Sequence, residues 1–212
     1  MNPASIPVQA GPPERVLLLP GIWMPAWSLG WLGRRLAAQG FRVCTQGYPG
    51  VRGGPERSLV HLLPALRESD AVVCHSLGGL MTLEALRLEP DLPVRRVVCL
   101  GSPLRGSVVA ARLHRRPLGL ALGRSARLLS RGVELPWPGR AEIGMVAGSF
   151  ERGVGKLLGV LREAGDGTVA LAETRWPGLS DHVVVAASHS GLIRSWAAAD
   201  LTIRFLRNGR FG

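Results

Sequence analysis

The fold is decided by residues 71–81, which read AVVCHSLGGLM. An apolar run of strand length ends at Ser76, and two glycines then open a run of helix-forming residues. A strand that turns sharply into a helix with a serine at the turn is a nucleophile elbow. The turn lifts the hydroxyl out of the carboxyl edge of a sheet, and the helix N-terminus that follows favours negative charge beside it. The alternative is an ordinary buried strand and helix with an incidental serine.

An elbow needs small residues two positions before and two positions after its serine, because strand and helix approach closely there. Gly78 meets this need, while Cys74 stands where the G-x-S-x-G pattern has its first glycine. Cysteine is itself small, so this departure is compatible with the turn.

Strand-like and helix-like segments alternate along the rest of the chain. With 212 residues, the chain suits one domain with a single core. Continuous apolar runs are typical of parallel strands that are buried on both faces. The other expected strands are residues 15–19, 41–45, 94–100, 141–147 and 183–187, and the expected helices are residues 28–38, 56–67, 77–88, 157–162 and 192–206. This order predicts an α/β fold with about six mostly parallel strands, helices on both faces, and a site at the carboxyl ends of the strands.

Residues 105–140 depart from this alternating pattern. They are rich in Arg and Leu, prolines and glycines interrupt them, and residues 118–129 can form a short amphipathic helix. One interpretation is a small cap insertion that hangs over Ser76 and shapes an apolar acyl pocket, lined by Trp137 and the leucines. The other is a plain crossover with a solvated basic face. The sequence favours neither, and it leaves open whether the segment moves as a lid.

Composition narrows the classes of protein that fit. The net charge of +11 comes from 26 Lys and Arg against 15 Asp and Glu, but Lys156 is the only lysine. So lopsided an arginine share is typical of a genome-wide bias, and no nucleic-acid-binding signature accompanies it, so we expect no nucleic-acid partner. No apolar run reaches eighteen residues, and residues 1–10 lack a basic region followed by an apolar core. We therefore expect neither a transmembrane helix nor a secretory signal.

Three cysteines, Cys44, Cys74 and Cys99, lie in apolar, strand-like runs. Their odd number and their spacing suit neither zinc nor a disulfide framework. We expect them to be small core residues in a reducing compartment, which indicates the cytoplasm.

An acid and a base follow Ser76 in an order that suits a catalytic triad. Asp166 lies between two glycines in a loop beyond a strand end, where a triad needs a fixed carboxylate to orient an imidazole. A simple Asp-Gly turn is the alternative. His189 comes just past the carboxyl end of the last expected strand, at the same edge as Ser76. Asp181 and Glu173 compete for the acid role, but Asp181 is expected at the opposite end of that strand.

The other histidines fit the base role less well. His182 shares the wrong edge of the sheet with Asp181. His75 neighbours the serine, but its side chain should point away from the hydroxyl. His61 and His114 lie on helix or cap segments and have no evident partner.

The loop after the first strand is a candidate oxyanion hole. Hydrolases that use an elbow place one backbone donor in this loop and the other just after the nucleophile. Here the donors would be the N–H groups of Ile22, which follows the turn at residues 20–21, and of Leu77. By itself the turn is better interpreted as a plain connection from strand to helix.

Four segments together resemble the α/β-hydrolase superfamily and, within it, small bacterial lipases and esterases. They are LPGI at residues 19–22, CHSLGG at 74–79, LGSPLRGS at 100–107, and DGTV at 166–169 with SHSG at 188–191 downstream. The order of Ser76, Asp166 and His189 is that superfamily's order of nucleophile, acid and histidine. Leu104 and Pro20 stand where many lipases have histidine, and neither is a triad position. The superfamily usually has eight strands, and the resemblance implies that the first two are absent here.

The resemblance implies a serine hydrolase, and the residues support this mechanism on their own. Ser76 would attack a carbonyl carbon with His189 as general base and Asp166 holding its tautomer. The oxyanion would rest on the N–H groups of Ile22 and Leu77. No metal or organic cofactor is needed. The leading prediction is therefore hydrolysis of a small-molecule carboxylic ester with an apolar acyl group.

Other functions remain open at this point. Thioester hydrolysis and acyl transfer use the same triad. A non-catalytic binding module on the same fold is suggested by Cys74, by the basic surface and by the missing strands. Weak contact with an anionic membrane would use Arg112, Arg115, Arg116, Arg124 and Arg127.

Overall fold

A six-stranded parallel sheet, in the order β2-β1-β3-β4-β5-β6, forms the centre of the molecule. The computed structural model describes residues 13–114, 117–134, 139–150 and 163–212. The strands are β1 Arg15–Leu19, β2 Arg42–Thr45, β3 Ala71–His75, β4 Arg96–Leu100, β5 Glu142–Gly148 and β6 Asp181–Val185. The predicted α/β class and the six expected strands are confirmed. The helix expected at residues 157–162 lies outside the described residues.

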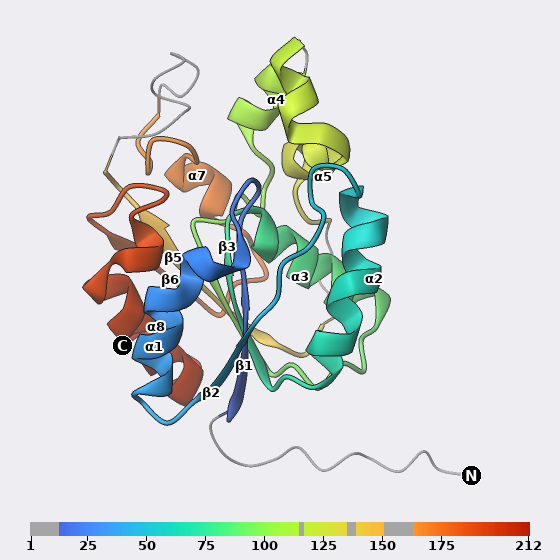
Figure 1. Cartoon of the computed structure of the whole chain (residues 1–212). Helices are drawn as coiled ribbons and strands as arrows, with labels where there is room; N and C mark the ends of the chain where they lie inside the picture. The colour runs from blue at the N-terminus through green and yellow to red at the C-terminus, as the bar shows by residue number, and fades with distance from the viewer. Residues whose placement is uncertain (1–12, 115–116, 135–138, 151–162) are drawn as a thin grey trace.

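Helices cover both faces of this sheet (Figure 1). On one face lie η1 Ala26–Leu29, α1 Gly30–Ala37, η3 Leu192–Arg194 and α8 Trp196–Asn208, and on the other lie α2 Gly54–Arg67 and α3 Leu77–Leu88. In place of the single helix expected over residues 192–206, the structure has the short 3-10 turn η3 followed by α8. Ser195 caps α8, because its side chain accepts a hydrogen bond from Ala198 N–H. Helical segments between successive strands return the chain to the amino edge of the sheet, so that all six strands run parallel.

The side chains of β1 show how the two faces divide the core. Leu17 and Leu19 pack into the cluster with α2 and α3, whereas Val16 and Leu18 pack into the cluster with α1 and α8. Successive side chains of a strand point to opposite faces, so a strand covered on both sides is apolar throughout. This double burial is the physical reason why β1 reads as a continuous apolar run.

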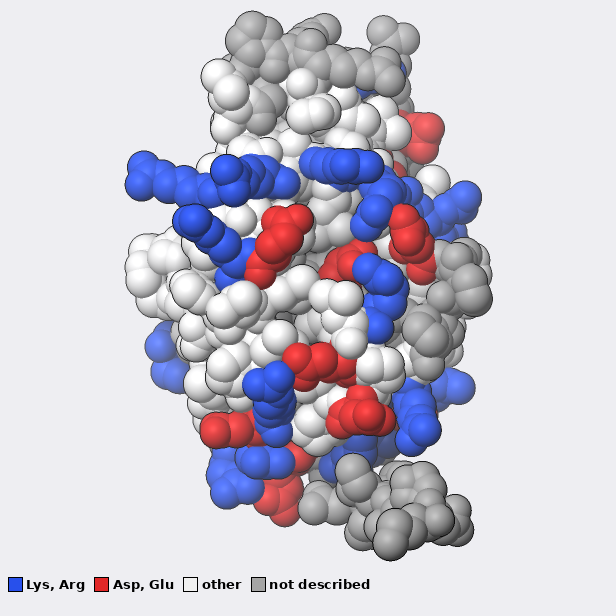
Figure 2. Space-filling model, turned by 90° about the vertical axis from the view of Figure 1, so that its right-hand side faces the viewer, with Lys and Arg blue, Asp and Glu red and all other residues white. Residues whose placement is uncertain are grey.

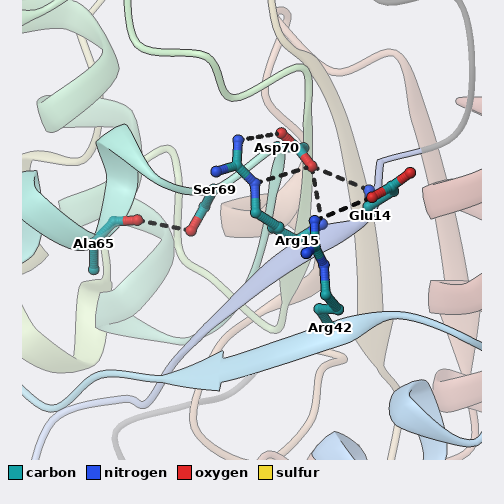
Figure 3. A network of polar contacts seen from close by, with 6 residues as sticks. All are labelled: Glu14, Arg15, Arg42, Ala65, Ser69 and Asp70. Carbon is teal, nitrogen blue, oxygen red and sulfur yellow. Dashed lines mark hydrogen bonds and ion pairs between the residues drawn. The ribbon is translucent and has the colours of Figure 1, made fainter.

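At the amino edge of the sheet, Asp70 ties the starts of β1 and β3 together (Figure 3). Its carboxylate accepts hydrogen bonds from the backbone N–H groups of Arg15, at 2.9 Å, and Glu14, at 3.2 Å, and pairs with the Arg15 guanidinium at 3.0 Å. Burial alone would raise the pKa of Asp70, but these hydrogen bonds and the charge of Arg15 together lower it. The contact fixes the register of the two strands that lead to the site.

The segment at residues 105–140 forms α4 Val108–His114, η2 Pro117–Ser125 and α5 Ala126–Arg131. Figure 1 shows α4 and α5 above the carboxyl ends of the strands. The prediction of one helix over residues 118–129 is wrong, because Gly123 breaks it with φ 55° and ψ −144°. A side chain at Gly123 would overlap the backbone of Val51, so only glycine fits there. Trp137 lies outside the described residues.

The cysteines differ from the prediction in one respect. Cys74 and Cys99 are buried and face each other across β3 and β4, with their Sγ atoms 3.6 Å apart. Cys44 is exposed, so the prediction that all three are core residues is wrong for it. Its strand β2 comes first in the strand order, and among the described residues it pairs with β1 alone.

The surface on the α2 side mixes both signs of charge (Figure 2). Arginines there are interspersed with acidic side chains, and Glu84 of α3 pairs with Arg87 at 2.8 Å and with Arg131 of α5 at 3.3 Å. Within the described part of the chain, no helix combines the length and the apolar character needed to cross a membrane.

Candidate active site

The turn between β3 and α3 has the geometry of a nucleophile elbow. Ser76 has φ 52° and ψ −118°, a conformation that non-glycine residues seldom adopt. Its backbone N–H donates to the carbonyl oxygen of Leu100 at 3.0 Å, which ties the turn to β4. A Cβ at Gly78 would lie 2.9 Å from the carbonyl oxygens of Leu19 and Pro20, closer than such atoms pack. Glycine is therefore required two positions after the serine.

The structure brings Ser76, His189 and Asp166 into one hydrogen-bonded chain. His189 Nε2 lies 3.0 Å from Ser76 Oγ, and His189 Nδ1 lies 2.7 Å from Asp166 Oδ2. The serine and the histidine are separated by 113 positions in the sequence. Because a carboxylate only accepts, Nδ1 carries the proton and Nε2 is left as the acceptor for the serine hydroxyl.

Asp166 is held by the turn that it starts. The carboxylate is 1% exposed, and Oδ1 accepts hydrogen bonds from Thr168 N–H at 3.0 Å and Val169 N–H at 2.7 Å. The other oxygen, Oδ2, is directed at His189. The sequence offered the Asp-Gly turn and the orienting acid as alternatives, but the carboxylate does both. Oδ1 holds the turn, and Oδ2 orients His189.

The two competing carboxylates lie elsewhere. Asp181 starts β6, at the amino edge, and accepts a hydrogen bond from Phe211 N–H at 2.8 Å. Glu173, in the short helix α7 Leu171–Thr174, accepts from Val108 N–H at 2.6 Å and from Ala170 N–H at 2.9 Å. Burial raises the pKa of Glu173, although these two bonds oppose the rise. Its contacts hold the start of α4 and leave the imidazole of His189 to Asp166.

An apolar cavity of about 260 Å³ opens onto the serine. Its polar lining residues are His75, Ser76, Ser107, Thr168, His189 and Ser190. Its apolar lining comes from the loop after β1, from the helices above the sheet and from two other loops: Gly21, Ile22, Trp23, Met24, Pro103, Val109, Ala110, Leu113, Leu122, Leu129 and Val169. A mostly apolar lining beside a few polar side chains is typical of a pocket for a small ligand with a hydrocarbon portion.

The loop after β1 is strained where it lines the cavity. Trp23 has φ 62°, and among the described residues other than glycine only Ser76 shares a positive φ. The indole Nε1–H of Trp23 donates to the carbonyl oxygen of Ala121 in η2 at 2.8 Å. Backbone strain of this kind clusters at functional sites and persists only where surrounding contacts hold it.

The two predicted oxyanion donors belong to two segments that adjoin the serine, the loop after β1 and the start of α3. Ile22 lines the cavity next to Trp23. Leu77 is the first residue of α3, and the first N–H groups of a helix have no acceptor within it. An anion beside Ser76 Oγ would thus meet the helix N-terminus, whose dipole favours negative charge.

Sequence reasoning assigned no role to two residues that adjoin this site. Tyr48 donates its hydroxyl proton to the carbonyl oxygen of Pro20 at 2.8 Å and so holds the start of the loop after β1. Burial raises the pKa of the Tyr48 phenol, which keeps it a donor. His75, expected to point away from the serine hydroxyl, lines the cavity and contacts His189. Its position beside the serine was the one signal that could have drawn attention to it.

Solved structures of similar shape include a lipase, a phospholipase and a carboxyl esterase. The mature lipase BlEst2 of Bacillus licheniformis has a TM-score of 0.77 at 18% identity, with 97% of this chain and 96% of that chain covered. Against the propeptide form of the same lipase, 52% of that chain is covered. Phospholipase PlaB of Legionella pneumophila has a TM-score of 0.71 at 16% identity, covering 95% of this chain and 60% of that chain. A metagenomic carboxyl esterase has a TM-score of 0.56 at 22% identity, with 85% of this chain and 65% of that chain covered. No family model and no curated protein matches the sequence.

Proposed function

Because the chain has the α/β-hydrolase fold, we propose that it is a serine hydrolase that cleaves carboxylic esters. One observation carries the proposal: the hydrogen-bonded chain from Ser76 through His189 to Asp166 opens into an apolar cavity. Fold alone would not support an activity, since one fold hosts many functions. A serine within 3.0 Å of an imidazole that a buried carboxylate orients supports nucleophilic catalysis.

In the proposed first step, Ser76 Oγ forms a bond to the ester carbonyl carbon while its proton passes to His189 Nε2. Asp166 remains ionised and stabilises the imidazolium that results. The tetrahedral intermediate collapses as the bond to the alcohol oxygen breaks, and that oxygen takes the proton from Nε2. Water then attacks the acyl-enzyme by the same path, so the acid is released and the serine hydroxyl is restored.

The negative charge of the tetrahedral intermediate would fall on the former carbonyl oxygen. The N–H groups of Ile22 and Leu77 are the proposed donors for it. Such donors are each worth about 3 kcal/mol of transition-state stabilisation where water is excluded. The apolar lining of the cavity supports this, because it keeps water away from the charge.

We also propose that residues 105–140 are a cap on a single α/β-hydrolase domain. Leu113 of α4, Leu122 of η2 and Leu129 of α5 line the cavity, which supports an acyl-binding role for the segment. The proposal includes a cytoplasmic location, where the thiols of Cys74 and Cys99 would stay reduced.

The test is covalent labelling with a fluorophosphonate probe, read by intact mass. We expect the wild type to gain one label, Ser76→Ala to gain none, and the control Ser149→Ala to label like the wild type, since Ser149 is an exposed serine at the same edge of the sheet. Turnover of nitrophenyl esters should fall at least about a thousandfold in Ser76→Ala. Folded wild type that takes no label would refute the proposal and favour a binding module.

Nitrophenyl esters of increasing chain length, assayed beside thioesters of the same acyl groups, would separate the chemistries. A preference for esters supports the proposal. A preference for thioesters, or acyl transfer to an added alcohol in place of water, would keep the triad and change the reaction.

A further inference from the structure

A second histidine lies against the proposed base. His75, the last residue of β3, is 1% exposed, and its ring centroid lies 4.6 Å from that of His189 with the planes tilted by 49°. His75 Nε2 lies 2.9 Å from the backbone carbonyl oxygen of His189. Because a carbonyl oxygen can only accept, His75 Nε2 carries a proton and donates it.

His75 is neutral at ordinary pH. Burial and, to a lesser extent, the neighbouring His189 lower the pKa of His75 to about 3. With Nε2 protonated, Nδ1 is a bare acceptor, and it is buried with no hydrogen-bond partner among the described residues. A Cβ on Gly21 would lie 2.9 Å from Nδ1, so the loop after β1 closes over this atom.

Packing alone does not explain a histidine at this position. An unpaired buried acceptor lowers stability, and an apolar side chain of similar size would avoid that cost. The compensating interaction is the hydrogen bond from Nε2 to His189. The polar interaction that a histidine adds at residue 75 is therefore a hydrogen bond to the backbone of the proposed base, His189.

His189 is held at four points. Its backbone N–H donates to the carbonyl oxygen of Asp166 at 3.0 Å, and its Nδ1 donates to Asp166 Oδ2 at 2.7 Å. Its Nε2 meets Ser76 Oγ at 3.0 Å, and its carbonyl oxygen accepts from His75. Asp166 thus fixes one side of the residue, and two consecutive residues of the elbow fix the other.

The stretch that His75 restrains is a loop, which Leu192 N–H also ties by donating to the Ser188 carbonyl oxygen at 3.0 Å. Ser190, which follows His189, is exposed, and the next regular element is the short 3-10 turn η3. A general base must keep its nitrogen in line with the nucleophile through both halves of the reaction, and small displacements are costly.

We propose that His75 is a positioning residue, which holds the backbone carbonyl of His189 through Nε2–H and so keeps the imidazole aligned with Ser76 Oγ. The inference rests on the proposed hydrolase function. His75 transfers no proton to substrate in this proposal and contacts no reacting atom.

Three substitutions at residue 75 separate the hydrogen bond from packing. The amide nitrogen of glutamine reaches about as far as Nε2 of histidine, whereas that of asparagine matches Nδ1 and is too short. Leucine keeps the bulk and has no donor. The control His61→Asn makes the same chemical change at an exposed position of α2. Circular dichroism and thermal melting would check that each variant is folded.

We expect His75→Asn and His75→Leu to lower kcat by about ten- to hundredfold with KM little changed, and His75→Gln to stay within about threefold of the wild type. His61→Asn should match the wild type. Wild-type kcat in both His75→Asn and His75→Leu would overturn the proposal. So would a loss in His75→Gln as large as that in His75→Asn, because the donor would then not matter.

A second readout needs no turnover. In proton NMR spectra, the Nδ1–H of His189 bonded to Asp166 should give a downfield resonance that is sharp in the wild type and in His75→Gln, and broadened by exchange with water in His75→Asn. Identical spectra in all three proteins would overturn the inference. If wild type takes no fluorophosphonate label, the proposed function fails, and these spectra still decide whether His75 positions His189.

Discussion

Replacing Gly101 with alanine should lower kcat/KM, whereas alanine at a glycine of similar backbone conformation away from the site should lower stability alone. Gly101 follows β4 with φ 59°, and its N–H donates to the carbonyl oxygen of Val146 at 3.0 Å. A Cβ at this position would lie 2.8 Å from Leu192 Cδ1, 3.0 Å from Asp166 Oδ2 and 3.2 Å from His189 Nδ1. The added methyl group would therefore press on the two atoms whose hydrogen bond orients the imidazole.

The size of the effect follows from which neighbour can move. The end of the Leu192 side chain can rotate away, but Asp166 is held at Oδ1 by two backbone N–H groups. Contacts between carbon and oxygen need about 3.3 Å or more, so the Asp–His pair must shift by a few tenths of an ångström. Since a displacement of about 1 Å can cost about a hundredfold, we expect kcat/KM to fall by about ten- to hundredfold. Because Gly101 has a left-handed backbone conformation, alanine there should also lower the free energy of unfolding by about 1–2 kcal/mol.

Gly40→Ala is the matched control, because Gly40 also has a positive φ, of 91°, yet nothing lies within 4 Å of its Cβ position. It should lose stability by about the same amount, on the order of 1 kcal/mol, with kcat/KM unchanged. Nitrophenyl ester kinetics and thermal melts of the three proteins make the comparison. Wild-type kcat/KM in Gly101→Ala, or an equal loss of activity in Gly40→Ala, would refute the reasoning.

Three further predictions concern the cavity wall and the sheet. Trp23→Phe keeps an aromatic ring and removes the N–H that donates to Ala121, so the strained loop should relax and kcat should fall by about tenfold at constant KM. An unchanged kcat would show that the loop keeps its conformation without this hydrogen bond. Ala110→Leu narrows the cavity, so the preferred nitrophenyl ester should become shorter than in the wild type, whereas an unshifted optimum would place the acyl chain elsewhere. Asp70→Asn should destabilise the fold by about 1–3 kcal/mol near neutral pH, measured by urea unfolding. Because the native pKa of Asp70 is lowered, its stabilisation is present above the unfolded value of about 3.9 and is lost as the pH falls through the native one. The stability gap between wild type and Asp70→Asn should therefore close in acid, and a gap that stays constant would exclude the carboxylate as its source.

Local patterns were enough to predict the sheet. A parallel strand covered on both faces is apolar throughout, so the inner strands β1, β3, β4 and β5 could be found without knowing their neighbours. The elbow was equally local, because its serine and the glycine two positions later sit in one turn. The edge at which Asp166 and His189 lie followed from a general rule, since all strands of such a sheet end on the same side.

Other features of the site come from contacts between segments that are far apart in the sequence. The break at Gly123 exists because the backbone of Val51 leaves no room for a side chain, and nothing near residue 123 indicates this. Likewise, the indole of Trp23 finds its acceptor 98 positions away. Glycine and tryptophan each fit many environments, so their residue types alone do not identify these partners.

The sequence by itself determined which residue types could act and on which edge of the sheet they would meet, because both depend on local periodicity and on chain order. Only the tertiary structure decided how they are held: Asp166 divided between a turn and an imidazole, and His189 held on one side by His75. The physical reason is that a hydrogen bond needs its two atoms within a few tenths of an ångström of their best distance. That precision arises from the packing of the whole chain, which no single segment encodes.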